Sequence, residues 1–180
     1  MVKVYFSNIF ELKNLNSKIE ALPEIRKQYV LDIKDLKRQK QSICVWLLLE
    51  YCIKQDYFGF QSDFVQENNV FREKNNNFYF SLAHSGDFVV AALSDNKVGV
   101  DIERCCEKIL KLKNKPEFTE CLSVEDITLK WTKKESLFKC KDGKNFYSKA
   151  IFDHLEQKYI LTVCTDEDSA EFIQVNPLYL

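Results

Sequence analysis

The stretch from Val98 to Glu103, VGVDIE, sets two carboxylates inside a short apolar run and constrains the fold more than any other part of the chain. Its alternating pattern predicts a β-strand. Residues two apart in a strand point to the same face, with Cα atoms roughly 6.6 Å apart at about 3.3 Å per residue. Asp101 and Glu103 therefore share a face, where their like charges need water or a shared cation.

Composition limits the class of protein. The chain has 180 residues, of which 46% are hydrophobic and 29% charged, as in one globular domain or two small halves that share a core. A net charge of −1 without a long basic block argues against a nucleic-acid partner. The longest apolar run, near Trp46, is too short to span a bilayer, and no secretory signal is visible. We expect a cytoplasmic protein with no membrane partner.

The seven cysteines are irregularly spaced and form no C-x-x-C pair. This pattern predicts free thiols in a reducing compartment rather than disulfides or a zinc site.

Hydrophobic periodicity predicts a mixture of helices and strands, that is, an α+β fold. Strands are expected at residues 2–9, 78–82, 88–93, 98–103, 159–164 and 171–175. A first helical region is expected over 12–31, with a break at Pro23. A second helix is expected from Leu36 to about Gln55, with Asp32 or Asp35 as its cap, and a third from Ser123 to about Cys140. The region 58–77 is expected to be turn-rich, and 105–120 a short helix plus loop at best.

The loop at 83–87 and a hairpin turn at 94–97 predict how the acidic strand is placed. We expect residues 98–103 to return antiparallel beside 88–93. Asp101 and Glu103 would then approach the end of the strand at which His84 lies.

The helix that begins at Ser123 carries Trp131, Glu135 and Lys139 at i, i+4 and i+8, along one stripe. Ile127 and Phe138 are expected to provide apolar anchoring. Glu135 thus supplies a third carboxylate that can face the same cleft.

Asp101, Glu103 and Glu135 together predict an oxygen-only site that suits Mg²⁺, Mn²⁺ or Ca²⁺ better than zinc. The alternative is that all three are solvated surface residues. Lys139 either neutralises a phosphate oxygen or forms an i,i+4 ion pair with Glu135. A group of basic residues has two interpretations as well, a solvated helical face or a phosphate-binding edge. It comprises Lys34, Lys37, Arg38 and Lys40.

Two motifs resemble the phosphopantetheinyl transferases. VGVDIE at 98–103 is similar to the family's G-[IV]-D-[IVL]-E, and WTKKESLFK at 131–139 to its W-[ST]-x-K-E-[SA]-x-x-K. Ala83-His84-Ser85-Gly86 resembles the family's S-H-S-G loop, upstream by the expected distance. The likeness is closest to the surfactin-synthetase-activating (Sfp-like) type.

The resemblance implies a pseudo-dimer within one chain: two similar α/β halves whose antiparallel-rich sheets each pack on a long helix. It places coenzyme A phosphates on residues 1–97, and the magnesium site and catalytic helix on 98–180, with the active site between the halves of a monomer. The implied reaction transfers 4′-phosphopantetheine from coenzyme A to a serine of an acyl or peptidyl carrier protein, in fatty acid or secondary metabolite biosynthesis.

The resemblance also assigns roles to residues. Asp101, Glu103 and Glu135 would bind Mg²⁺, for which Mn²⁺ can substitute. Glu135, directly or through a water, would take the proton from the serine hydroxyl, and Lys139 would hold the pyrophosphate. Coenzyme A would be bound by His84, Ser85, Arg38, Lys37, Lys40 and Lys139.

The chain departs from the family pattern in three places. Ala83 replaces a serine, Asn68-Asn69-Val70 lies where the family has G-K-P, and the segment between Glu103 and Trp131 is short. Two other functions stay open: a module that binds coenzyme A or a carrier protein without turnover, and a metal-dependent nucleotide phosphohydrolase.

Overall fold

The structure is a computed structural model that describes residues 1–12, 15–58, 63–67 and 70–180. The strands are β1 (Val2–Asn8), β2 (Phe64–Glu67), β3 (Val70–Glu73), β4 (Tyr79–Ser85), β5 (Phe88–Ser94), β6 (Val98–Arg104), β7 (Asn145–Phe152), β8 (Lys158–Thr165) and β9 (Ala170–Gln174). The helices are α1 (Leu15–Glu20), α2 (Glu24–Leu31), α3 (Leu36–Asp56) and α4 (Val124–Cys140), and three 3₁₀ segments are η1 (Glu107–Asn114), η2 (Pro116–Phe118) and η3 (Pro177–Tyr179).

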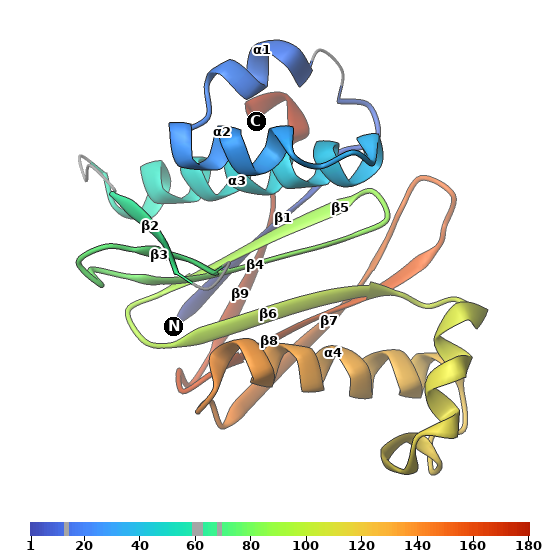
Figure 1. The fold of residues 1–180 in the computed structure, drawn as a ribbon. Coiled ribbons are helices and arrows are strands. Elements are labelled where there is room, and N and C mark those ends of the chain that lie inside the picture. Colours follow the sequence, from blue (N-terminus) through green and yellow to red (C-terminus); the bar gives the residue numbers. More distant parts are fainter. Residues whose placement is uncertain (13–14, 59–62, 68–69) are drawn as a thin grey trace.

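Two sheets form the centre of the molecule, with a helix layer outside each (Figure 1). The larger sheet has the order β4-β5-β1-β9, and the smaller one β6-β8-β7. Neighbouring strands are antiparallel except β1 and β9, which are parallel. The mixed α+β architecture with antiparallel sheets and long helices is as predicted from the sequence.

Apolar side chains fill the space between these layers. One cluster packs α3 on the larger sheet and includes Trp46, Leu49 and Val89, and a second lies between the sheets and includes Val90, Val100 and Leu161. Every residue of β5 is buried, as its almost continuous apolar sequence predicts for a strand covered on both faces. A smaller cluster under α4 joins Ile127 to Phe118.

The two long helices begin at caps that the sequence indicates. The Asp35 carboxylate accepts a hydrogen bond from the Arg38 amide at 2.8 Å, which selects Asp35 over Asp32 as the cap of α3. Ser123 and Asp126 form a capping box at the start of α4. The expected break at Pro23 is confirmed, because this residue lies between α1, which ends at Glu20, and α2, which begins at Glu24.

Three local expectations are wrong. The range 58–77 is not merely turn-rich, because it contains the antiparallel pair β2 and β3. Ala83, His84 and Ser85 belong to β4 rather than a loop, since the turn consists only of Gly86 and Asp87 between the paired Ser85 and Phe88. Phe138 is 77% exposed and does not anchor α4, whereas Ile127 is buried as expected.

The expected pairing of β6 with β5 is also wrong. Both edges of β5 are occupied, one by β1 and the other by β4, so no edge is left for β6. The chain therefore crosses at residues 95–97 to the smaller sheet, where β6 pairs with β8. The division into halves at 97/98 stays a prediction, and β9 from the second half adds to the sheet of the first.

Candidate functional site

Gly99 allows α4 to lie directly on β6. A Cβ atom at Gly99 would come within 2.0 Å of the Ser136 carbonyl oxygen and 2.6 Å of the Cys140 nitrogen. A side chain at this position would therefore push the last turns of the helix away from the strand. The close approach carries Glu135 and Lys139 toward the acidic face of β6.

Lys139 contacts Asp101 across this interface. Its Nζ donates to Asp101 Oδ1 at 2.9 Å and to the Val100 carbonyl oxygen at 2.8 Å. The ion pair thus joins α4 to β6, and it differs from the pair with Glu135 that helical spacing allows.

The carboxylate of Asp101 is strongly perturbed. Its Oδ2 atom is buried and has no hydrogen-bond partner within the described residues. Burial raises the pKa of Asp101 to about 6, although the Lys139 ammonium opposes the rise. The nearby carboxylates of Glu103 and Glu135 raise this pKa further. The three predicted acidic residues therefore share one electrostatic environment.

Glu103 connects the acidic face to β4. Its Oε2 accepts a hydrogen bond from Ser85 Oγ at 2.9 Å. A second bond, from the Val100 amide to Ser81 Oγ at 3.0 Å, links the same two strands. β4 and β6 are thus edge strands of different sheets joined through serine side chains, which brings the His84 segment beside the carboxylates by a route other than the expected hairpin.

His84 lies in a positive environment. Although its side chain reaches solvent, the atoms around it remove part of the hydration of the imidazole and so lower its pKa. The charges of Arg38, Lys139 and Arg26 lower the pKa further. These cations come from three different helices, α3, α4 and α2, and all three act on the imidazole.

The basic end of α3 lies against the β4–β5 turn. Gln41 Nε2 donates to the Gly86 carbonyl oxygen at 2.8 Å, and Lys37 lies 3.6 Å from Asp87. Lys40 donates to the Phe10 carbonyl oxygen at 3.1 Å, and the Arg38 side chain is exposed. Gly86 itself has φ +58°, a conformation that suits glycine.

Arg26 is a further cation whose charge acts on His84, and the motifs in the sequence do not point to it. Its Nη2 donates to the carbonyl oxygen and Oγ of Ser42, both at 2.8 Å, and its guanidinium lies over the rings of Tyr29 and Trp46. Burial lowers its pKa to about 10. The signal was its position on α2 four residues before the buried Val30, which puts both on the inner face of the helix.

The donor set fits an oxygen-preferring divalent cation. Three carboxylates lie near one ammonium, and the buried Oδ2 of Asp101 accepts no hydrogen bond from the part of the chain that the structure describes. As the side chains stand, the described part of the chain holds no group of three or more His, Cys, Asp or Glu residues placed to bind one ion. Asp101 is turned toward Lys139 and Glu103 toward Ser85, so binding by all three requires side-chain rotation.

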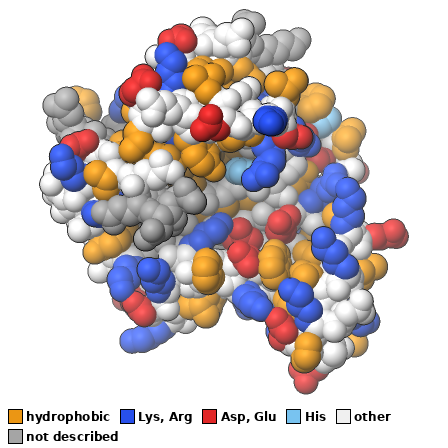
Figure 2. Space-filling model, in the orientation of Figure 1, with side chains coloured by type: hydrophobic (Ala, Val, Ile, Leu, Met, Phe, Trp, Pro, Cys, Tyr) orange, Lys and Arg blue, Asp and Glu red, His pale blue; other side chains and the backbone are white. Residues whose placement is uncertain are grey.

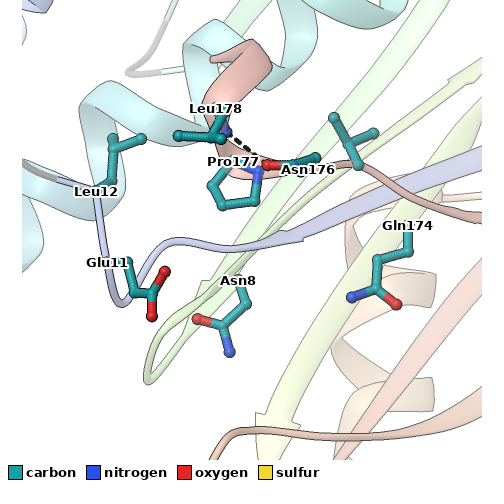
Figure 3. Close-up of a pocket in the computed structure, with 8 residues that line it drawn as sticks. Asn8, Glu11, Leu12, Gln174, Asn176, Pro177 and Leu178 are labelled. Carbon is teal, nitrogen blue, oxygen red and sulfur yellow. Dashed lines mark hydrogen bonds between the residues drawn. The ribbon is translucent and has the colours of Figure 1, made fainter.

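Figure 2 shows acidic side chains in the hollow between the upper and lower parts of the molecule, with Lys and Arg side chains around them. A different pocket, of about 620 Å³, lies between the ends of β1 and β9, and its lining contains none of the predicted site residues. Glu11, Asn8 and Gln174 point into it, and Asn176 beside them is bonded to the Leu178 amide (Figure 3).

A scan against protein-family models and a search of curated proteins both found no match to the chain.

Residues 68 and 69, in the place of the family's G-K-P motif, lie outside the described residues. Across the parts that are described, none of the helices has both the length and the apolar character needed to cross a membrane.

Proposed function

We propose that the protein is a Mg²⁺-dependent 4′-phosphopantetheinyl transferase. It would use coenzyme A as the donor and an apo acyl or peptidyl carrier protein as the acceptor. The proposal rests on the motif resemblance together with the arrangement of the residues that carry it, since no relative contributes to it.

The observation that carries the proposal is the meeting of three separate sequence segments. Ser85 of the 83–86 motif is hydrogen-bonded to Glu103 of the 98–103 motif. Asp101 of that same motif is bonded to Lys139 of the 131–139 motif. The three segments lie on three different elements, β4, β6 and α4. A cluster that combines acidic and basic groups in this way suits a metal-bound pyrophosphate.

Asp101, Glu103 and Glu135 would hold the magnesium ion. When bound, the ion would neutralise charge on the pyrophosphate of coenzyme A and orient it. Two observations support this assignment: the buried Oδ2 of Asp101 accepts no hydrogen bond within the described ranges, and negative charge is in excess around it.

The remaining steps belong to the chain's own side chains. Glu135, directly or through a water, takes the proton from the serine hydroxyl as its oxygen attacks the phosphorus that bears the pantetheine arm. The bond from that phosphorus to the bridging oxygen breaks, and adenosine 3′,5′-bisphosphate leaves with the electron pair. Lys139 offsets the charge that develops on the leaving phosphate.

Residues at the start of α3 and the end of β4, together called the basic edge, would bind the phosphates of coenzyme A. His84 and Arg38 are its central members, because the positive charge of Arg38 acts on the imidazole and lowers its pKa. Lys37, Lys40 and Ser85 lie on the same elements and complete the assignment. A phosphate group would favour the charged imidazole that the surrounding cations disfavour.

The test is release of adenosine 3′,5′-bisphosphate from coenzyme A, measured with and without Mg²⁺ and with and without an apo carrier protein. The proposal predicts release that requires both. Release without any acceptor would indicate a phosphohydrolase instead. Binding of coenzyme A without release, across several carriers and with a folded protein, would indicate a binding module.

A further inference from the structure

Lys139 holds the carboxylate to which a cation would bind. Its ammonium contacts Oδ1 of Asp101 and the Val100 carbonyl oxygen, while Oδ2 of the same carboxylate is buried and has no hydrogen-bond partner among the residues that the structure describes. In this arrangement Lys139 acts as the internal counter-ion of the acidic face.

A divalent cation on Asp101 would stand next to this ammonium. Like charges a few Å apart repel strongly where water is partly excluded, and the Asp101 side chain is only 13% exposed. The Lys139 side chain is 30% exposed and sits in the last turn of α4, so it has an open path to solvent. Its four-carbon stem makes such a movement inexpensive.

We infer that Lys139 is an exchangeable counter-ion that leaves Asp101 when a divalent cation binds and is then free to bind phosphate. This inference rests on the proposed function, because it uses the same carboxylates and the same anionic ligand. The charge of Lys139 already acts on His84, so the released ammonium begins within range of the basic edge.

The exchange couples the two ligands. A cation releases the ammonium that an anion needs, and an anion that holds the ammonium leaves Asp101 open to the cation. Such coupling is reciprocal, so each ligand must strengthen binding of the other by the same factor. The site would thereby hold cation and phosphate together rather than either alone.

The direct test is the reactivity of the Lys139 amine in the wild-type protein. The protein is acetylated briefly with an N-hydroxysuccinimide ester, and modification at Lys139 is measured by peptide mass spectrometry. Mg²⁺ alone should accelerate modification of Lys139, and coenzyme A added with Mg²⁺ should slow it again. Modification of Lys133, an exposed lysine of the same helix, should not respond. If Mg²⁺ binds and Lys139 reactivity is unchanged, the ammonium stays on Asp101 and the inference is wrong.

Calorimetry gives the second readout. Lys139→Met should bind Mg²⁺ about tenfold more tightly than the wild type when no other ligand is present, as expected if one counter-ion contact of about 1.4 kcal/mol no longer competes. Coenzyme A should strengthen Mg²⁺ binding to the wild type by at least about fivefold, and this enhancement should be clearly smaller in Lys139→Met, where only the direct attraction between the ion and the pyrophosphate remains. Lys133→Met should behave as the wild type. Equal enhancement by coenzyme A in wild type and Lys139→Met would overturn the inference.

These readouts separate the inference from the proposed function. The labelling with Mg²⁺ alone involves neither coenzyme A nor an acceptor protein. Cation-dependent release of Lys139 without any transfer activity would keep the inference about the cation and remove the proposed reaction. Transfer activity with an unresponsive Lys139 would have the opposite meaning.

Discussion

The acidic face of β6 and the basic end of α3 hold their charges in different ways. Asp101 is largely buried, with one oxygen unpartnered in the described residues, whereas Arg38 is exposed to water. Burying a carboxylate without full compensation costs free energy, while a solvated guanidinium costs little. Binding of a cation would therefore offset the cost of the buried carboxylate on the acidic face. The solvated cations at the basic end carry no such cost, so only an observed anion would assign them a binding role.

The two regions nevertheless share one property. In each region the protein disfavours the charge of one group: the pKa of Asp101 on β6 is raised, and that of His84 on β4, which the Arg38 charge of α3 reaches, is lowered. A cation beside Asp101 or a phosphate beside His84 would reverse the respective shift. Shifts of this kind are common at functional sites, and here they occur in adjacent strands.

The largest expected difference between the regions is in catalysis. Asp101→Asn and Glu135→Gln should each lower the transfer rate by on the order of a thousandfold, because they remove charges that act on the reacting phosphate. Glu125→Gln, on the first turn of the same helix, and Ala83→Ser should have little effect. Steady-state kinetics with a carrier substrate measures this, and a loss below tenfold at both acidic residues would contradict their proposed roles.

Glycine substitution should damage the acidic side more than the basic side. Gly99→Ala puts a methyl group against backbone atoms of α4 and should reduce the free energy of unfolding by about 3 kcal/mol. Gly86→Ala costs about 1–2 kcal/mol for its positive φ. It also meets the Tyr159 hydroxyl at 2.1 Å, which is a clash with one side chain rather than with helix backbone.

Urea denaturation of both variants and of Gly86→Ala/Tyr159→Phe checks this order. The double variant should recover part of the loss at Gly86, because the crowding hydroxyl is gone. A greater loss for Gly86→Ala than for Gly99→Ala would mean that α4 does not pack on β6 as described.

The pH dependence of stability isolates Asp101. With divalent cations removed by a chelator, the Asp101 carboxyl is expected to have its ordinary pKa of 3.8 in the unfolded chain and a pKa of about 6 in the folded protein. Between these values the folded state binds more protons, so the free energy of unfolding falls as pH rises, by about 3 kcal/mol at most. The fall should be absent in Asp101→Asn and reduced by saturating Mg²⁺. Identical pH profiles for wild type and Asp101→Asn in chelator would exclude the buried, perturbed carboxyl.

The smallest effect belongs to the basic edge. Arg38→Ala should raise the KM for coenzyme A about tenfold and leave the KM for the carrier protein unchanged, since a phosphate contact of about 1.4 kcal/mol is lost. Lys54→Ala, at the other end of α3, is the matched control. An unchanged KM for coenzyme A would favour the other interpretation, in which these basic residues form only a solvated helical face.

Local signals account for what the sequence predicted well. The caps at Asp35 and Ser123 lie next to the helices that they start, and the stripe of Glu135 and Lys139 follows from helical geometry alone. Asp101 and Glu103 share a face for an equally local reason. These features depend on neighbours within four residues, and a single sequence contains them.

The errors that bear on the candidate site concern partners distant in the chain. The pairing of β6 depended on which strands had already occupied the edges of β5, and the partner of Lys139 depended on how closely Gly99 allows α4 to approach. Phe138 is exposed because the inner face of α4 is set by its packing on β6 and β8 rather than by hydrophobicity. Arg26 was missed because a cation on an inner helix face contradicts the usual pattern.

The most direct measurement is the intact mass of apo carrier proteins after incubation with this protein, coenzyme A and Mg²⁺. The account predicts addition of one phosphopantetheine group at a single serine of at least one carrier in a broad panel, and none with the Glu135→Gln variant. Unchanged masses across the panel, with a folded protein that binds coenzyme A, would contradict the proposed transferase.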